Sequence, residues 1–237
     1  MLILALESTA AMASASLLRD GKLLAQFSLN SGNTHSTTLL PMAQQILSAS
    51  GLSAADVDLF ACTVGPGSFT GVRIGAATVK GLAFGTEKPC VGVSSVEALA
   101  WGMRMAEGIV CPLINARRTQ YYSALFRVKD GNVTRLTEDD VILDADLPGI
   151  LAAYEEPIYL CGDGYEAAWR ADLHPQLCVT PPEYRLPNAY AAAQCAAHIY
   201  ETAEAPSVFT AANLTPIYLR KTQAEREREE RLAAQNG

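Results

Sequence analysis

The sequence predicts an α/β protein whose first half forms a mixed sheet with helices packed against it. Short apolar runs separated by turn residues alternate there with longer amphipathic runs, the order expected for strands and helices. A glycine-rich turn at 65–71 joins one such strand to one such helix. Hydrophobic residues make up 49% of the chain and charged residues 18%, and 237 residues suffice for one large domain or two modest ones.

The chain starts with three expected antiparallel strands, at 2–9, 12–19 and 22–29. An Asp-Gly pair between the second and third is a hairpin signal. A helix is expected next, from about 36 to 50. Hydroxyl residues at its start provide caps, Pro41 is tolerated only in or near the first turn, and a glycine ends it.

The rest of the first half alternates strands and helices. We expect strands at 58–64 and 90–93, and helices at 70–84 and 96–105, the last capped by Ser94 and Ser95. A second half begins near residue 108, so we predict an N-terminal lobe at 1–107 and a C-terminal lobe at 108–237.

The second half is predicted to start with a hairpin. Its expected strands are 109–115, 120–128 and 157–161, its helices 164–172 and 188–203, and its acidic loops 138–140 and 144–146. The last stretch, 221–231, alternates Glu and Arg at helical spacing, which is typical of a solvated helix or a frayed tail.

The glycine-rich turn supports two interpretations. Glycines allow positive φ and close approach, and amides at a helix start favour an anion, so the turn could cradle a phosphate. Glycines inside the following helix cost about 1 kcal/mol each unless close packing compensates, which favours a tight packing face instead. The turn lacks the lysine of a P-loop and the glycine spacing of a dinucleotide fingerprint.

Polar residues near this turn are candidates for phosphate binding. Glu7, Ser8 and Thr9 lie where the first strand turns into the second, although Ser and Thr also stabilise turns by bonding to the backbone. The candidate phosphate- or nucleotide-facing residues are Glu7, Ser8, Thr9, Gly65, Gly67, Ser68 and Arg117.

Composition disfavours several other chemistries. Three scattered histidines and six scattered cysteines without a C-x-x-C pair predict no metal site and reduced core thiols. A net charge of −7 disfavours direct, strong nucleic-acid binding. The chain has no apolar run of about 18 residues and no basic leader, so we expect a cytoplasmic protein without a membrane span. A Ser-His-Asp triad stays open, because its members need not be near in sequence.

Two helices carry small or apolar residues over more than one face. Such a helix can pack closely on two sides, either within the chain or against a second subunit. On the second interpretation, the helices at about 36–50 and 70–84 form the partner surface. Its predicted residues are Leu39, Met42, Ala43, Ile46, Gly71, Ile74, Gly75 and Thr78.

With these residues in view, the sequence resembles the TsaB (YeaZ) family, bacterial relatives of the Kae/Qri/TsaD transferases. The resemblance spans nearly the whole chain, and the glycine-rich segment is its most specific part. One departure is Asn115, where the family often has Asp. The similar segments are 3–9, 35–36 with 40–41, 65–75, 92–95 with 97–99, 116–117 and 216–220.

The resemblance implies the two-lobed fold of the actin and sugar-kinase superfamily, each lobe a mixed sheet flanked by helices. It implies a non-catalytic partner of TsaD that, with the ATPase TsaE, supports threonylcarbamoyl transfer to the N6 of adenosine in tRNA. The catalytic relative has a His-x-Glu-x-His metal pattern, whereas this chain has Ser95, Glu97 and Leu99 there.

The same resemblance sets the expected partners and cofactors. The partners are TsaD in a heterodimer, TsaE, and a second copy when TsaD is absent, with tRNA contacted only through the complex. No cofactor is expected on this chain alone, and ATP or ADP is a candidate at the boundary with TsaD. The alternatives are an autonomous ATP-using phosphotransferase or ATPase and, from an old label for relatives, a metallopeptidase.

Overall fold

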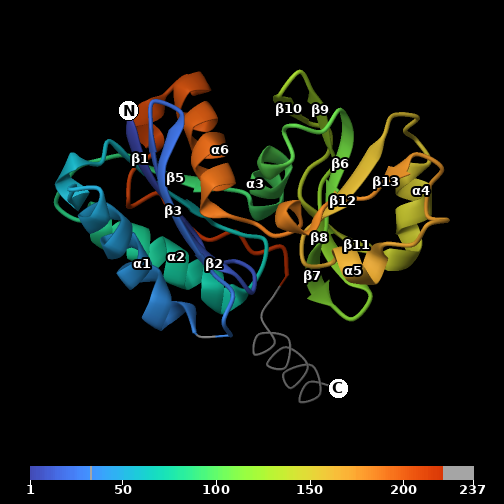
Figure 1. The fold of residues 1–237 in the computed structure, drawn as a ribbon, viewed down its shortest axis with the longest axis horizontal. Helices are drawn as coiled ribbons and strands as arrows, with labels where there is room; N and C mark the ends of the chain where they lie inside the picture. The colour runs from blue at the N-terminus through green and yellow to red at the C-terminus, as the bar shows by residue number, and fades with distance from the viewer. Residues whose placement is uncertain (33, 221–237) are drawn as a thin grey trace, which may run out of the picture.

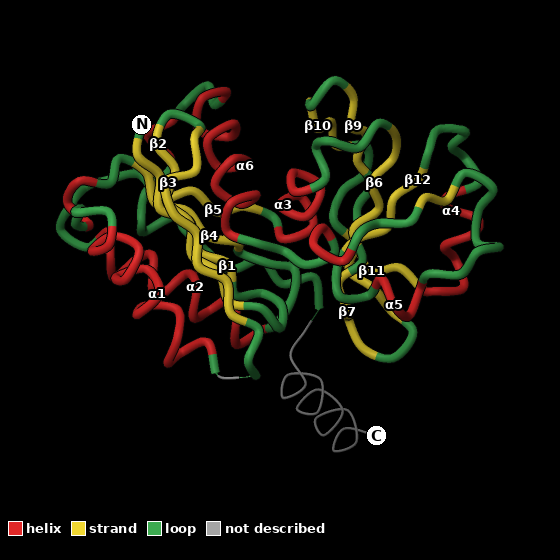
Figure 2. Tube along the Cα trace, in the orientation of Figure 1, coloured by secondary structure: helices red, strands yellow, loops and turns green. Residues whose placement is uncertain are grey.

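Three sheets organise the chain in two halves that lie side by side in the computed structural model, which describes residues 1–32 and 34–220 (Figures 1 and 2). The first half is built on a five-stranded sheet in the order β3-β2-β1-β4-β5. Its strands are β1 (Leu2–Glu7), β2 (Ala13–Arg19), β3 (Lys22–Leu29), β4 (Leu59–Thr63) and β5 (Cys90–Val93). The predicted strands of this half are therefore confirmed.

The sheet is mixed because β1 pairs antiparallel with β2 and parallel with β4. Alternate residues of β1 point to opposite faces, so Leu4 packs in one core and Ile3 in another. Helices cover both faces, which explains why every residue of this strand is buried and all but Glu7 are apolar.

Helices α1 (His35–Ala49) and α2 (Phe69–Ala83) cover one face of the first sheet, and α6 (Ala189–Thr202) covers the other (Figures 1 and 2). The first two agree with the predicted helices to within a residue. Pro41, however, lies in the second turn of α1, and Thr34 occupies the N-cap without a side-chain cap bond. The sequence grouped the helix at 188–203 with the second half, whereas α6 packs on β1, β2, β4 and β5.

The second half contains a five-stranded sheet in the order β10-β9-β6-β12-β13 and a three-stranded sheet in the order β11-β8-β7. Both expected hairpin strands are divided, because each passes from one sheet to the other. The strands are β6 (Gly108–Pro112), β7 (Ile114–Arg117), β8 (Gln120–Ser123), β9 (Phe126–Lys129), β10 (Asn132–Arg135), β11 (Asp140–Leu143), β12 (Ile158–Cys161) and β13 (Leu177–Cys178).

Helix α3 (Ser95–Gly102) joins the halves. Its Ala98 and Trp101 pack with α6, while its Val96 and Leu99 pack with the second half. Ser94 caps it as predicted, its hydroxyl accepting from the Glu97 amide.

The remaining elements are short. The helix expected at 164–172 forms only over 165–168, and the acidic stretch at 138–146 contains a strand and a 3-10 turn. The short helices are α4 (Leu147–Leu151) and α5 (Tyr165–Ala168). The 3-10 turns are Ala54–Asp56, Asp144–Asp146, Pro182–Tyr184 and Pro206–Val208. Within 1–32 and 34–220, no helix has the length and apolar character needed to cross a bilayer. The charged tail predicted at 221–231 lies outside the described residues.

Candidate functional site

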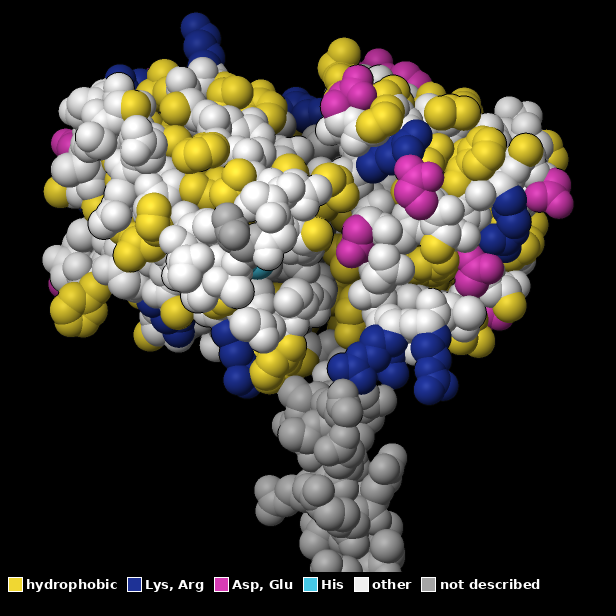
Figure 3. Space-filling model, turned by 60° about the horizontal axis from the view of Figure 1, so that its bottom comes forward, with side chains coloured by type: hydrophobic (Ala, Val, Ile, Leu, Met, Phe, Trp, Pro, Cys, Tyr) yellow, Lys and Arg dark blue, Asp and Glu magenta, His cyan; other side chains and the backbone are white. Residues whose placement is uncertain are grey.

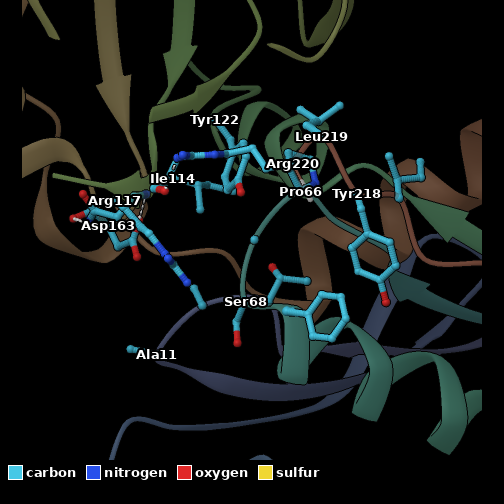
Figure 4. A pocket seen from close by; sticks show the side chains of 17 residues that line it. Ala11, Pro66, Ser68, Ile114, Arg117, Tyr122, Asp163, Tyr218, Leu219 and Arg220 are labelled. Atoms are coloured by element: carbon cyan, nitrogen blue, oxygen red, sulfur yellow. Dashed lines mark hydrogen bonds between the residues drawn. The ribbon is translucent and has the colours of Figure 1, made fainter. Parts of the chain in front are cut away.

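A cavity of about 600 Å³ lies between the two halves. Four segments line it: the turn after β1, the glycine-rich turn before α2, the β7–β8 hairpin with Asp163, and residues 217–220 (Figure 4). On the face shown in Figure 3, Lys and Arg side chains gather along the lower edge, and most acidic side chains lie on the right-hand half. Of the predicted phosphate-facing residues, only Thr9, Gly67, Ser68 and Arg117 line this cavity.

Glycines in the turn let three backbone segments meet. Gly65 has a φ of +108°, and a Cβ there would lie 2.5 Å from the carbonyl oxygen of Ile217. A Cβ on Gly67 would lie 2.7 Å from the carbonyl oxygen of Thr9. The Gly65–Pro66 peptide is cis. Close backbone packing therefore requires these glycines, and a phosphate at the turn stays a prediction.

The first glycines of α2 pack against the end of β1. A Cβ on Gly71 would lie 1.9 Å from the Ser8 carbonyl oxygen, and one on Gly75 would lie 2.8 Å from the Ser8 hydroxyl. Ser8 itself donates to the carbonyl of Gly71 at 2.9 Å. This is the tight packing face of the second interpretation, and its partner is the chain's own sheet.

Glu7 lies two residues before the cavity-lining Thr9 and is fully buried. Its Oε1 accepts from the amide and the hydroxyl of Thr9, both at 2.6 Å. Burial raises the pKa of the Glu7 carboxyl, and its bonds to hydroxyls and to an amide oppose that shift. Glu7 and Ser8 do not line the cavity: Glu7 stabilises the turn through Thr9, and Ser8 bonds to α2. That either residue faces a phosphate stays a prediction.

The β7–β8 hairpin forms the second-half wall. The amide of Asn115 donates to Asp163 Oδ1 at 2.8 Å, and its side-chain Nδ2 donates to the Asp163 carbonyl at 2.9 Å. An Asp at position 115 could not donate the second bond, which gives a structural reason for Asn here. Burial raises the pKa of Asp163. Arg117 has a φ of 115°, rare for a residue with a side chain.

Sequence reasoning missed several lining residues. Asp163 and Tyr122 carried no pattern that would separate them from ordinary strand ends. Arg220 stood in a segment that resembles the family, yet nothing in the sequence placed it at the cavity. The missed side chains are Phe69, Asn115, Tyr122, Asp163, Tyr218 and Arg220.

Most of the predicted partner-surface residues are buried within this chain. The apolar arc of α1 faces the first sheet, since helices that cover a sheet bury their apolar stripe there. Leu39, Met42, Ala43 and Ile46 are at most 4% exposed, and Gly71 and Gly75 are also buried. Only Ile74 and Thr78 retain part of their surface. The prediction is therefore wrong for six of the eight residues.

Other residues of the same helices are exposed. The outer face of α1 and α2, as the term is used below, consists of Leu40, Pro41, Gln44, Gln45, Arg73, Ala77, Gly81 and Phe84 with the partly exposed Ile74 and Thr78. Leu40 is 40% exposed and Phe84 is 87% exposed. Exposed large apolar side chains with polar ones around them are typical of protein contacts.

The residues at the metal-pattern positions have structural contacts. Ser95 is buried, and Leu99 packs with Val96 and Phe126 in the core beneath α3. Glu97 forms an ion pair with Arg135 at 2.5 Å. Among residues 1–32 and 34–220, no three His, Cys, Asp or Glu side chains cluster closely enough for a metal ion.

Comparisons with known proteins agree with this geometry. The family model of TsaD, tRNA N6-adenosine threonylcarbamoyltransferase, matches residues 23–166. The tRNA threonylcarbamoyladenosine biosynthesis protein TsaB of Bacillus subtilis is 31% identical over 162 residues, covering 68% of this chain and 71% of that protein. The chain belongs to the TsaB (YeaZ) family. The TsaB protein of Escherichia coli is 36% identical over 149 residues, which cover 62% of this chain and 64% of that protein.

Solved structures of the TsaB (YeaZ) family share the fold. YeaZ from Pseudomonas aeruginosa superposes with a TM-score of 0.76 at 26% identity, covering 92% of this chain and 99% of that one. A P. aeruginosa protein described as similar to peptidase YeaZ gives a TM-score of 0.79 at 27% identity over the same shares. The α/β fold of this family, with two halves built on helix-flanked sheets, is confirmed.

Proposed function

We propose that this chain is the non-catalytic scaffold subunit in the synthesis of N6-threonylcarbamoyladenosine in tRNA. In this role it binds and supports TsaD, together with TsaE. The observation that carries the proposal is the 31% identity to a TsaB protein over 162 residues. The net charge of −7 favours contact with tRNA through the complex rather than through this chain.

The contacts of α3 support a non-catalytic role. Leu99 has no donor atom for a metal and is 2% exposed, so its side chain contributes to the core. Glu97, the acidic member of the pattern, is bonded to Arg135. Glu97 and Leu99, two of the three positions that correspond to the relative's metal pattern, thus stabilise the junction between the halves.

The outer face of α1 and α2 is the surface we assign to TsaD. The inner face of these helices is already covered by the first sheet, which leaves the outer face for a partner. In the absence of TsaD the same surface serves a second copy. Paired subunits commonly use one self-complementary patch in this way. The nucleotide expected at the boundary with TsaD stays a prediction.

Two matched pairs of variants test the partner surface. Leu40→Glu and Ala77→Glu place a charge on the outer face, whereas Leu143→Glu and Ala167→Glu do so at exposed positions in the second half. We expect the first pair to weaken binding to purified TsaD at least about tenfold by calorimetry and the second pair to leave it unchanged, because a buried charge opposes docking. Equal affinities for all four variants would contradict the assignment.

Reconstitution tests the function itself. TsaD, TsaE, tRNA, ATP and threonylcarbamoyl adenylate are assayed for threonylcarbamoyladenosine with and without this chain, and this chain is also assayed with the same tRNA, ATP and adenylate but without TsaD and TsaE. We expect efficient modification only when all three proteins are present. Modification by this chain alone, or modification that does not depend on it, refutes the proposal.

The cavity is the observation that favours the alternative, an autonomous ATP-using enzyme. Arg117 and Ser68 line it and could contact phosphates. Steady ATP turnover by the isolated chain, abolished in Arg117→Ala, would establish that alternative. If the parental chain turns over ATP no faster than the Arg117→Ala variant, the alternative of an autonomous ATP-using enzyme is excluded.

A further inference from the structure

A short C-terminal segment, residues 214–220, crosses from the first half to the second between the sheets (Figure 1). We call it the strap. On the first half, Leu214 is buried in the core beneath α1 and α2. The amide of Ile217 donates to the carbonyl of Val64 at 2.7 Å, and Gly65 leaves room for the Ile217 carbonyl. The strap is thus fixed to the end of β4.

The other end of the strap is fixed to the β7–β8 hairpin. Arg220 Nη1 donates to the carbonyl of Ala116 at 2.9 Å and to Gln120 Oε1 at 2.7 Å. Ile217, Tyr218 and Leu219 of the strap line the cavity, and Figure 4 labels the last two. The strap therefore closes one side of the cavity and bridges its two walls.

A third attachment joins the strap to α2. Arg73 Nε donates to the Tyr218 hydroxyl at 2.9 Å. The Tyr218 ring lies 4.7 Å from the Phe69 ring, and the Arg73 guanidinium lies 3.8 Å above Phe69. Both rings line the cavity, and their contact with a cation adds to the stacking.

Arg73 also belongs to the outer face of α2. It is exposed and lies one helical turn before Ala77, so the two side chains lie on the same side of the helix. A protein docked on that face would contact the side chain that holds Tyr218.

We propose that the strap couples the outer face of α2 to the cavity. A partner that draws Arg73 away from Tyr218 loosens the strap and opens the cavity. A ligand that fills the cavity against the strap conversely changes the affinity for the partner, because coupling between two sites is reciprocal. The role of the partner in this inference rests on the proposed function, whereas the attachments of the strap do not.

Amide hydrogen exchange of the isolated full-length chain tests the strap. Arg73→Gln removes the cation, Tyr218→Phe removes only the hydroxyl, and Arg220→Gln removes the second-half attachment. We expect the Ile217 amide to exchange about tenfold faster in Arg73→Gln and Arg220→Gln, since each loses a charge-assisted bond. In both variants, exchange should also rise in the hairpin at 114–122. Arg127→Gln, which removes an ion pair with Glu156 inside the second half, is the matched control and should change neither segment.

Tyr218→Phe keeps the ring and removes only the hydroxyl, so it distinguishes the loss of this one bond from a general loss of folding. Faster exchange at Ile217 in this variant, with α6 amides unchanged, supports the strap. If the amides at 114–122 exchange at the same rate in Arg73→Gln as in the parental chain, Arg73 is not coupled to the hairpin and the proposal is overturned. The same conclusion follows if Arg127→Gln has an equal effect.

A final arm adds purified TsaD to the parental chain. We expect binding to speed exchange at Ile217 and at 114–122. TsaD that binds without changing either segment overturns the coupling alone. TsaD that does not bind contradicts the proposed function, while the variants still decide whether the strap links α2 to the hairpin.

Discussion

At the residue scale, Glu7 illustrates what sequence reasoning could and could not decide. The Glu-Ser-Thr run at a strand end correctly predicted a tight turn, because Ser and Thr bond readily to nearby backbone. It could not tell whether the carboxylate points to a ligand or inward. The structure buries it completely, and the Thr9 amide and hydroxyl take up one of its oxygens.

The buried Glu7 should make stability depend on pH. Burial raises its pKa above the ordinary 4.5, so the folded protein binds more protons than the unfolded chain in the interval between the two values. Stability is then lost as pH rises through that interval, by at most about 1.4 kcal/mol per pH unit. Glu7→Gln keeps an oxygen for Thr9 but carries no charge, so its stability relative to the parent should increase as pH rises through the same interval.

Urea unfolding of both proteins at several pH values checks this. Glu155→Gln, at an exposed position, is the control and should follow the pH dependence of the parent. A difference between Glu7→Gln and the parent that is independent of pH would show that Glu7 does not titrate above its usual range in the fold.

At the element scale, the positions of helices and strands could be predicted from the sequence, whereas the elements they pack against could not. Apolar spacing gave α1 and α2 within a residue. The same spacing cannot reveal whether an apolar arc faces the chain's own sheet or a second subunit, so Leu39 and Ile46 were assigned to the wrong surface. The strands at 109–115 and 120–128 were predicted as continuous because a strand that changes sheets keeps its apolar character.

Glycines of α2 offer a sharp comparison within one helix. A methyl group at Gly71 would meet the Ser8 backbone oxygen at 1.9 Å, whereas nothing lies within 4 Å of one at Gly81. We expect Gly71→Ala to lower the free energy of unfolding by about 2–3 kcal/mol through overpacking. Gly81→Ala should raise it by up to about 1 kcal/mol through helix propensity. Chemical denaturation of the two variants measures both, and equal effects would contradict the packing of α2 on β1.

At the scale of the whole molecule, the two halves of the structure do not correspond to the first and second parts of the sequence. Helix α6 follows the second-half strands in sequence but covers the first sheet. The sequence offered no sign of this return, because an alanine-rich helix such as α6 fits closely against either sheet. The segments that resemble the family predicted the two-lobed fold. The cavity between the lobes could not be predicted, because nothing in the sequence placed Asp163 and Arg220 beside it.

A polar network spans the halves at α3. Arg135 of β10 bonds to Glu97 of α3 and to Asp139, both at 2.5 Å, and Asp139 accepts from the Ser94 hydroxyl at 2.6 Å. The side chains of Arg135, Glu97 and Asp139 are 26%, 23% and 14% exposed, so removal of the cation leaves two half-buried carboxylates unpaired.

Arg135→Gln should therefore lower the free energy of unfolding by about 2–3 kcal/mol, because bonds between charged groups are involved. Arg127→Gln is the matched control. Its ion pair with Glu156 lies inside the second half, with side chains 44% and 38% exposed, so its loss should cost less than about 1 kcal/mol. Urea unfolding followed by circular dichroism measures both. If the network joins the halves, Arg135→Gln also speeds amide exchange in α3 and at 135–139 together, whereas a change confined to β10 means that α3 is held by its apolar contacts alone.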